Sequence, residues 1–70
     1  REEAAGLIAT LTDRQRAVLT GMAEGQLNKQ IAFDLGLTER TVKMHRAAVL
    51  RTLEVRSVAE AIRIAIEAGL

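Results

Sequence analysis

The stretch Thr38–Leu53 reads TERTVKMHRAAVLRTL, and it predicts one helix with two different faces. Thr38 is the expected N-cap, because its hydroxyl can accept a backbone N–H of the first turn, and Glu39 places a negative charge where the helix dipole favours one. At about 100° per residue, two stripes separate along this helix. The first stripe is aliphatic and is expected to be buried; it comprises Val42, Val49, Leu50 and Leu53. The second lies roughly opposite and comprises Arg40, Lys43, Met44, Ala47 and Arg51.

The second stripe mixes long cations with small or slender side chains. Such a surface can enter a groove and touch its floor, whereas the alternative for an isolated stretch is a solvated cationic helix face. Residues 38–56 carry five Lys/Arg against two acids, although the whole chain has a net charge of only +1. A local basic stripe on a near-neutral domain is compatible with nucleic-acid binding.

A short helix is expected immediately before this stretch, over Asn28–Leu35, with Asn28 as its cap. Two residues separate this helix from Thr38. Two helices joined so closely form a helix-turn-helix and cross at a steep angle. Their approach needs a small residue on the first helix, a turn residue that tolerates positive φ and a buried aliphatic residue beyond it. The chain supplies Ala32, Gly36 and Val42.

An upstream helix and a downstream helix complete the pattern. Upstream, Thr12 or Asp13 can cap a helix that ends at Gly25, with an apolar stripe of Leu11, Val18, Leu19 and Met22. Downstream, Ser57 and Glu60 form a capping box for a last helix that reaches about Ala68. This last helix has two apolar faces, of which one comprises Val58, Ile62, Ala65 and Ile66 and the other Ala61, Ile64 and Ala68. The second face indicates self-association; an ordinary amphipathic helix is the alternative.

Composition favours one small all-α domain. The chain has 70 residues, of which 49% are hydrophobic, with Phe33 as its only aromatic residue and no proline. We expect a compact four-helix domain that contains the helix-turn-helix and lacks a wing. Residues 11–70 should form this domain, and residues 1–10 should be a linker or a helical lead-in. No apolar run approaches the roughly 18–20 residues of a membrane span.

Catalysis and metal binding find no support in the sequence. The chain contains no cysteine, which excludes disulfides and Cys-based zinc sites. His45 is the only histidine, and it has no partner constellation for acid–base or nucleophilic chemistry. We therefore expect no enzyme activity, no metal and no cofactor. Arg46 lies at the edge of the predicted core, where it either pairs with an acid or contacts a phosphate.

Taken together, the motifs resemble the LuxR/FixJ-type helix-turn-helix domain, also called the NarL family. The resemblance runs from about Leu11 to Ala65 and is carried by LTDRQRAVL (11–19), AEG (23–25), NKQIA (28–32), LGLT (35–38), TVKMHR (41–46) and VRS with the later EA (55–61). HRAAVLRTL (45–53) is similar to the FixJ-type response regulators. Three positions depart from the family pattern: Leu27 replaces a capping Ser, Glu54 a Gly and Val58 a polar residue.

The resemblance implies that residues 38–53 form the recognition helix, which lies in the DNA major groove. The family's base-facing positions coincide with those that the helical wheel leaves free, namely Lys43, Met44 and Ala47. Lys43 can donate to guanine, whereas Met44 and Ala47 offer apolar contact, for example to a thymine methyl group. Phosphate contacts are expected near helix N-termini and from flanking cations, at Asn28, Lys29, Thr38, Thr41, His45, Arg40 and Arg51.

The resemblance also implies a homodimer, formed on activation through the last helix, with Ala61, Ile64 and Ala68 as the expected contact. Two recognition helices would then read a two-fold symmetric site on double-stranded DNA. FixJ-type proteins couple dimerisation to phosphorylation of a receiver domain, so we expect a receiver or sensor domain N-terminal to this segment. Such a regulator works in the cytoplasm without a membrane partner.

The predicted function is that of a sequence-specific DNA-binding effector domain of a bacterial two-component transcriptional regulator. One alternative is a sigma-factor region 4, which has a similar start, Gly turn and basic helix. That region usually stops near the end of its recognition helix, whereas this chain continues with the helix capped by Ser57. A second alternative, from another class, is a helical protein-interaction module whose basic face binds an acidic partner.

Overall fold

The computed structural model describes residues 2–70 of the chain. Within that span the backbone forms no strand and five α helices, namely α1 (Glu2–Ala9), α2 (Asp13–Ala23), α3 (Asn28–Leu35), α4 (Glu39–Leu53) and α5 (Val58–Glu67). The all-α prediction is confirmed, and α2 to α5 are the four helices expected from the sequence. The additional helix, α1, lies in the segment for which a linker and a helical lead-in were both open.

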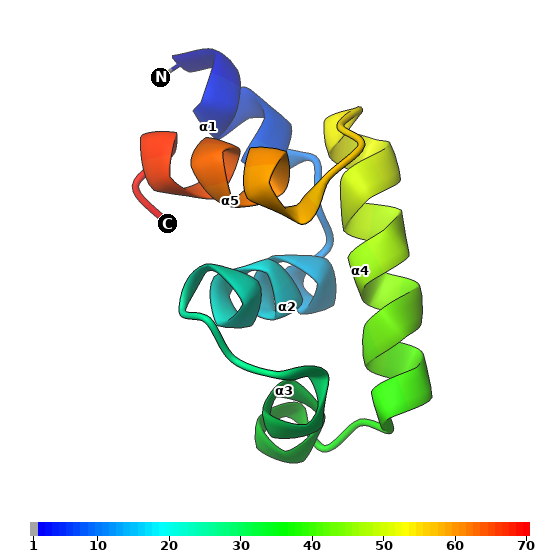
Figure 1. Cartoon of the computed structure of the whole chain (residues 1–70). Coiled ribbons are helices and arrows are strands. Elements are labelled where there is room, and N and C mark those ends of the chain that lie inside the picture. Colours follow the sequence, from blue (N-terminus) through cyan, green and yellow to red (C-terminus); the bar gives the residue numbers. More distant parts are fainter. Residues whose placement is uncertain (1) are drawn as a thin grey trace.

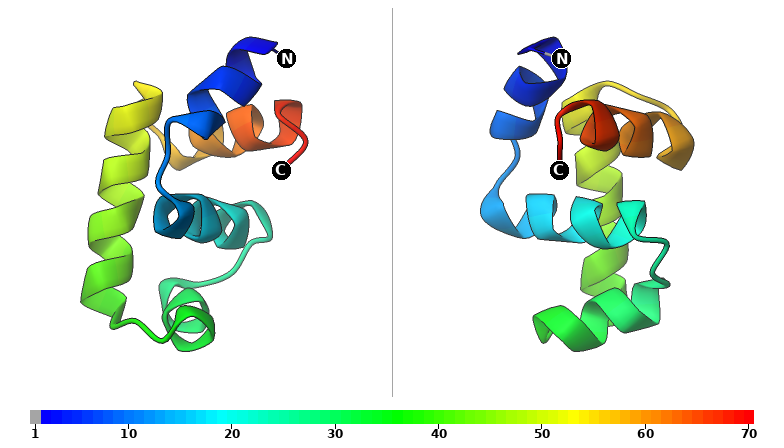
Figure 2. Two further views of the ribbon diagram at one scale, coloured as in Figure 1. Left: turned by 180° about the vertical axis from the view of Figure 1, so that it is seen from behind. Right: turned by 90° about the vertical axis from the view of Figure 1, so that its left-hand side faces the viewer.

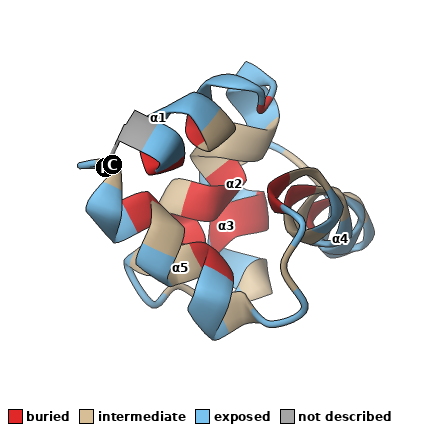
Figure 3. Cartoon of the chain, turned by 90° about the horizontal axis from the view of Figure 1, so that it is seen from above, coloured by how far each residue is buried: buried red, intermediate tan, exposed pale blue. Residues whose placement is uncertain are grey.

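Helix α4 is the longest element and stands along one side of the molecule (Figure 1). It packs against each of the other four helices. α1 and α5 lie beside its C-terminal end, α2 crosses its middle, and α3 lies beside its N-terminal end (Figure 2). Seen from above, the side of α4 that faces the other helices is buried and its opposite side is exposed (Figure 3). The fold therefore presents one face of α4 to the outside.

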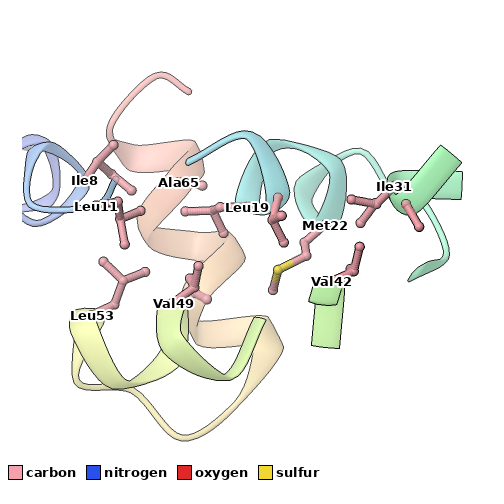
Figure 4. Packing of buried hydrophobic residues seen from close by; sticks show 12 residues of the cluster. Ile8, Leu11, Leu19, Met22, Ile31, Val42, Val49, Leu53 and Ala65 are labelled. Carbon is pink, nitrogen blue, oxygen red and sulfur yellow. The ribbon is translucent and has the colours of Figure 1, made fainter. Parts of the chain in front are cut away.

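One aliphatic core joins the helices (Figure 4). The predicted inward stripe of α4 is confirmed, because Val42, Val49 and Leu53 are buried and Leu50 packs partly buried against them. Leu11, just before α2, is buried as expected together with Val18, Leu19 and Met22 of α2. α5 contributes two small residues, Ala61 and Ala65. Burial of one such large aliphatic side chain stabilises the fold by about 1.5–3 kcal/mol. The core thus fixes which face of α4 points outward.

Side-chain caps set the start of three helices, as the sequence predicts. The hydroxyl oxygens of Thr12, Thr38 and Ser57 accept the backbone N–H three residues later, at 3.1, 3.1 and 3.2 Å. At α5, the carboxylate of Glu60 also accepts the backbone N–H groups of Arg56 and Ser57, at 3.0 and 3.1 Å. Each capped start leaves fewer backbone donors without a partner.

The start of α3 differs from the prediction. Asn28 is the first helical residue, not the cap, and Leu27 occupies the N-cap position. The Leu27 side chain has no acceptor, so the backbone donors of the first turn receive no side-chain oxygen from it. The carbonyl oxygen of the Gln30 side chain does accept the Leu27 backbone N–H, at 2.8 Å. The capping box of α3 is therefore half formed.

Four helices end with the same pair of backbone hydrogen bonds. At the end of α3, the Gly36 N–H donates to Phe33 and the Leu37 N–H to Ala32, and Gly36 is left-handed with φ 68°. Equivalent pairs end α2 and α5 through Gly25 and Gly69. α4 ends in the same way through Glu54 with φ 58°, the one non-glycine residue with positive φ among residues 2–70. α4 therefore ends through a residue that is not suited to this conformation.

Helix α1 packs against α5 and α4. Ala4 and Ile8 are buried, and Leu7 packs partly buried against the same core. Residues 2–9 thus form a helix that leads into the domain and packs against it. In residues 2–70, no helix combines the length and the apolar character that crossing a membrane requires.

Candidate nucleic-acid interface

The outward face of α4 carries the residues that the sequence predicted to contact bases. Lys43 and Ala47 are exposed, and Met44 is 62% exposed although it is apolar. Arg40 and Arg51, one turn before and one turn after this group, are also exposed. The spacing of these residues places them along one side of the helix. This face therefore combines long cations with the apolar side chains of Met44 and Ala47.

Among the described residues, the cations of this face form no ion pair within 4.0 Å. Among residues 2–70, the only ion pair within 4.0 Å joins Arg16 to Asp13, at 3.0 Å, and it lies on α2. Arg46 is half-buried, and the described residues provide no acidic partner for it. Of the two alternatives that the sequence left for Arg46, pairing with an acid is therefore not seen among residues 2–70.

The N-terminal turn of α4 contains two threonines that contact each other. The Thr38 hydroxyl accepts the Thr41 backbone N–H at 3.1 Å and donates to the Thr41 hydroxyl oxygen at 3.0 Å. In this arrangement Thr38 serves the helix cap, and the hydroxyl hydrogen of Thr41 stays available to an outside acceptor. His45, one turn further along, is half-buried. The helix dipole favours an anion at this end.

The remaining predicted phosphate contacts, Asn28 and Lys29, lie at the start of α3 and not on α4. Lys29 is exposed. Asn28 is half-buried, and its side-chain Oδ1 is buried without a hydrogen-bond partner among residues 2–70. These two residues thus lie on a different helix from the other predicted phosphate contacts.

Helices α2 and α3 approach each other closely at Gly21, a residue that the sequence analysis did not single out. Gly21 is buried, and a Cβ added there would lie 2.8 Å from Cγ1 of Ile31. The sequence prediction assigned the close contact of the motif to Ala32, which is indeed buried. A glycine in the middle of a helix was the available signal, because glycine is unfavourable there unless packing requires it.

The predicted self-association face of α5 is wrong in part. Ala61 is 0% exposed and belongs to the core, so it cannot contact a second copy of the folded domain. Ile64 and Ala68 are half-buried and pack against the core. Conversely, Ile66 was assigned to the inward face but is 66% exposed. The error has a physical cause: a helix with two apolar faces does not reveal from its own pattern which face the neighbouring helices cover.

The sequence matches the family model described as "Bacterial regulatory proteins, luxR family" over residues 9–65. Transcriptional regulatory protein FixJ of Azorhizobium caulinodans is 41% identical over 70 residues, which cover 100% of this chain and 33% of that protein. Nodulation protein W of Bradyrhizobium diazoefficiens is 42% identical over 64 residues, which cover 91% of this chain and 28% of that protein. The chain thus spans about a third of the length of these relatives.

Two solved structures of response regulators contain a domain with the same fold as this chain. Full-length FixJ from B. japonicum superimposes with a TM-score of 0.89 at 34% identity, over 97% of this chain and 34% of that one. The response regulator StyR superimposes with a TM-score of 0.85 at 38% identity, over 94% of this chain and 33% of that one. The chain belongs to the luxR family of bacterial regulatory proteins and is a helix-turn-helix DNA-binding domain of that family.

Proposed function

We propose that α4 is inserted into the major groove of duplex DNA and that Lys43, Met44 and Ala47 face the bases. The major groove admits an α helix, and lysine can donate to O6 and N7 of guanine. Met44 and Ala47 would offer apolar contact, for example to thymine methyl groups. The observation that carries the proposal is the composition of the exposed face of α4, where cations that have no ion pair among residues 2–70 surround Met44 and Ala47.

Phosphates are proposed to be bound around this face. Arg40 and Arg51 would reach the two strands that border the groove, and Thr41 would donate its free hydroxyl hydrogen at the N-terminus of α4. Lys29 and Asn28 would contact a phosphate beside α3. The other contributors in this proposal are Thr38, His45 and Arg46. Such contacts fix the register of the domain and carry no sequence information.

A second copy of the domain is proposed to pack against α5. The exposed apolar residues of α5 are Ala59 and Ile66, whereas Ile62 is half-buried and packs against the core. We therefore centre the contact on Ile66, in place of one centred on Ala61. Arg63 and Glu67 flank Ile66 with opposite charges, so the patch can be complementary to itself under a two-fold axis. Two copies of α4 would then read a symmetric DNA site.

For the whole protein, we propose a response regulator of the FixJ type, in which an N-terminal receiver domain controls this domain. The names and lengths of the relatives support this proposal, because the chain covers about a third of each. The regulator would act on chromosomal DNA in the bacterial cytoplasm.

The salt dependence of DNA affinity tests this placement of the interface. The change is Lys29→Ala, with Arg16→Ala as the control, because Arg16 carries the same charge but is paired with Asp13 on α2. The slope of log affinity against log salt is negative, and loss of one phosphate contact makes it shallower by about one unit. We expect that shallower slope for Lys29→Ala alone, measured by fluorescence anisotropy with a labelled duplex. Equal slopes for the two variants would contradict the proposed phosphate contact, and preferential binding to an acidic protein would contradict the function.

A further inference from the structure

A single hydrogen bond connects the start of α2 to the end of α3. Nη1 of Arg14 donates to the backbone carbonyl oxygen of Leu35 at 3.2 Å, across 21 residues of sequence. Arg14 lies in the first turn of α2, and Leu35 is the last residue of α3. Arg14 is exposed, so this contact does not serve to bury its charge.

This bond gives one more carbonyl group at the C-terminus of α3 a partner. The last carbonyl groups of a helix lack partners within the helix. Two of them, on Ala32 and Phe33, accept the N–H groups of Leu37 and Gly36. The carbonyl of Leu35 accepts from Arg14 instead. A cation at this position also interacts favourably with the negative end of the helix dipole.

The position of the bond matters because α4 begins so soon afterwards. Only residues 36–38 lie between Leu35 and the first residue of α4, so a displacement of the end of α3 is passed to the start of α4. A second contact holds the same end of α3, since Nε2 of Gln26 donates to the carboxylate of Asp34 at 3.1 Å. Arg14 is the contact that extends from α2, the helix that crosses the middle of α4 (Figure 1).

We infer that Arg14 is a positioning residue of the DNA-binding site: by holding the end of α3, it sets the angle at which α4 meets the groove. This inference rests on the proposed function, because a displaced α4 alters binding only if α4 reads DNA. Arg14 itself acts through the protein and contacts neither base nor phosphate.

Arg16 provides a matched control on the same helix. Its guanidinium donates to the Leu11 carbonyl and to the Asp13 carboxylate, both at 3.0 Å, and neither contact reaches α3. Arg14→Ala and Arg16→Ala therefore remove the same charge, but only the first releases the end of α3. Arg14→Gln keeps a long side chain with N–H donors and removes the charge. It separates a positioning role from an electrostatic one.

The experiment compares wild type and the three variants on a duplex selected by wild type and on a shuffled duplex, over a series of salt concentrations. Measurements are made at a temperature at which every variant is folded by circular dichroism. We expect Arg14→Ala to lose about threefold to tenfold in affinity for the selected duplex, the range that one net hydrogen bond allows. Arg14→Gln should recover part of this loss. The salt slope of Arg14→Ala should equal that of Arg16→Ala.

Amide NMR spectra of the free protein test the same inference without DNA. Arg14→Ala should shift the signals of residues 36–44, and Arg16→Ala should leave them in place. Equal spectra and equal affinities for the two alanine variants would overturn the inference. A salt dependence shallower by about one unit for Arg14→Ala than for Arg16→Ala would also overturn it, because Arg14 would then contact a phosphate. Failure of the proposed function would be seen with the wild type alone, as equal affinity for the selected and the shuffled duplex.

Discussion

Replacing Glu54 with glycine should stabilise the domain. Glu54 ends α4 with φ 58°, whereas Gly25, Gly36 and Gly69 occupy the equivalent left-handed positions at the ends of other helices. The left-handed conformation costs a non-glycine residue about 1–2 kcal/mol. Glycine gains additional freedom in the unfolded chain, which offsets about 0.5–1 kcal/mol of that amount. The net increase in the free energy of unfolding should be about 0.5–1 kcal/mol, equivalent to a Tm rise of about 2–8 °C for a domain of this size.

Two controls separate the backbone effect from other effects of Glu54→Gly. Glu54→Gln removes the negative charge, which is unfavourable at a helix C-terminus, but keeps the Cβ; its gain should be a few tenths of a kcal/mol, or about 0.3. Gly36→Ala is the reverse change at a site where an added Cβ meets no atom within 4 Å, so its destabilisation reports the backbone alone. Urea unfolding of all variants provides the free energies. A Glu54→Gly variant no more stable than Glu54→Gln would refute the reasoning.

Three further predictions concern helix caps and α5. Leu27→Ser should add the missing side-chain cap of α3 and stabilise the domain by about 0.5–1 kcal/mol relative to Leu27→Ala in urea unfolding; equal stability would contradict a cap there. Hydrogen bonds from the Arg56 backbone, and then from Ser57, hold the pKa of Glu60 below its ordinary value of 4.5. These bonds therefore stabilise the folded domain fully above pH 4.5, and the stabilisation is lost as the pH falls through the lowered pKa. Glu60→Gln should therefore weaken the acid dependence of unfolding, and an unchanged dependence would contradict this role. Ile66→Glu should leave the monomer folded but lower affinity for a two-half-site duplex; unfolding, as a buried charge would cause, would place Ile66 in the core.

The recognition helix could be predicted from sequence because its signals are local and agree with one another. Thr38 supplies the cap, and the aliphatic stripe from Val42 to Leu53 follows the helical period over about three turns. The residues of the helix outside this stripe must then face outward, which explains why the exposure of Lys43 and Met44 was predicted correctly. The short turn at Gly36 could be predicted as well, since few residue types other than glycine adopt a positive φ.

Other features depend on contacts between distant segments. α1 has eight residues with Gly6 in its interior, too short to be stable alone, and it is held by the burial of Ala4 and Ile8. The burial of Ala61 depends on which helices cover α5, and the bond between Arg14 and Leu35 depends on how α2 crosses α3. Periodicity within a single helix contains none of this information.

The central claim, that the outward face of α4 reads base sequence, is tested most directly by selecting binding sites from a random duplex library. Wild type and Lys43→Ala are compared at near-physiological salt, with a covalently linked dimer of each so that weak association does not limit the selection. The account predicts a two-fold symmetric motif for wild type. For Lys43→Ala it predicts relaxed preference at one base position per half-site, with a loss of about 1–3 kcal/mol on the wild-type motif. Identical motifs for both proteins, or no motif for the linked wild-type dimer, would contradict the claim.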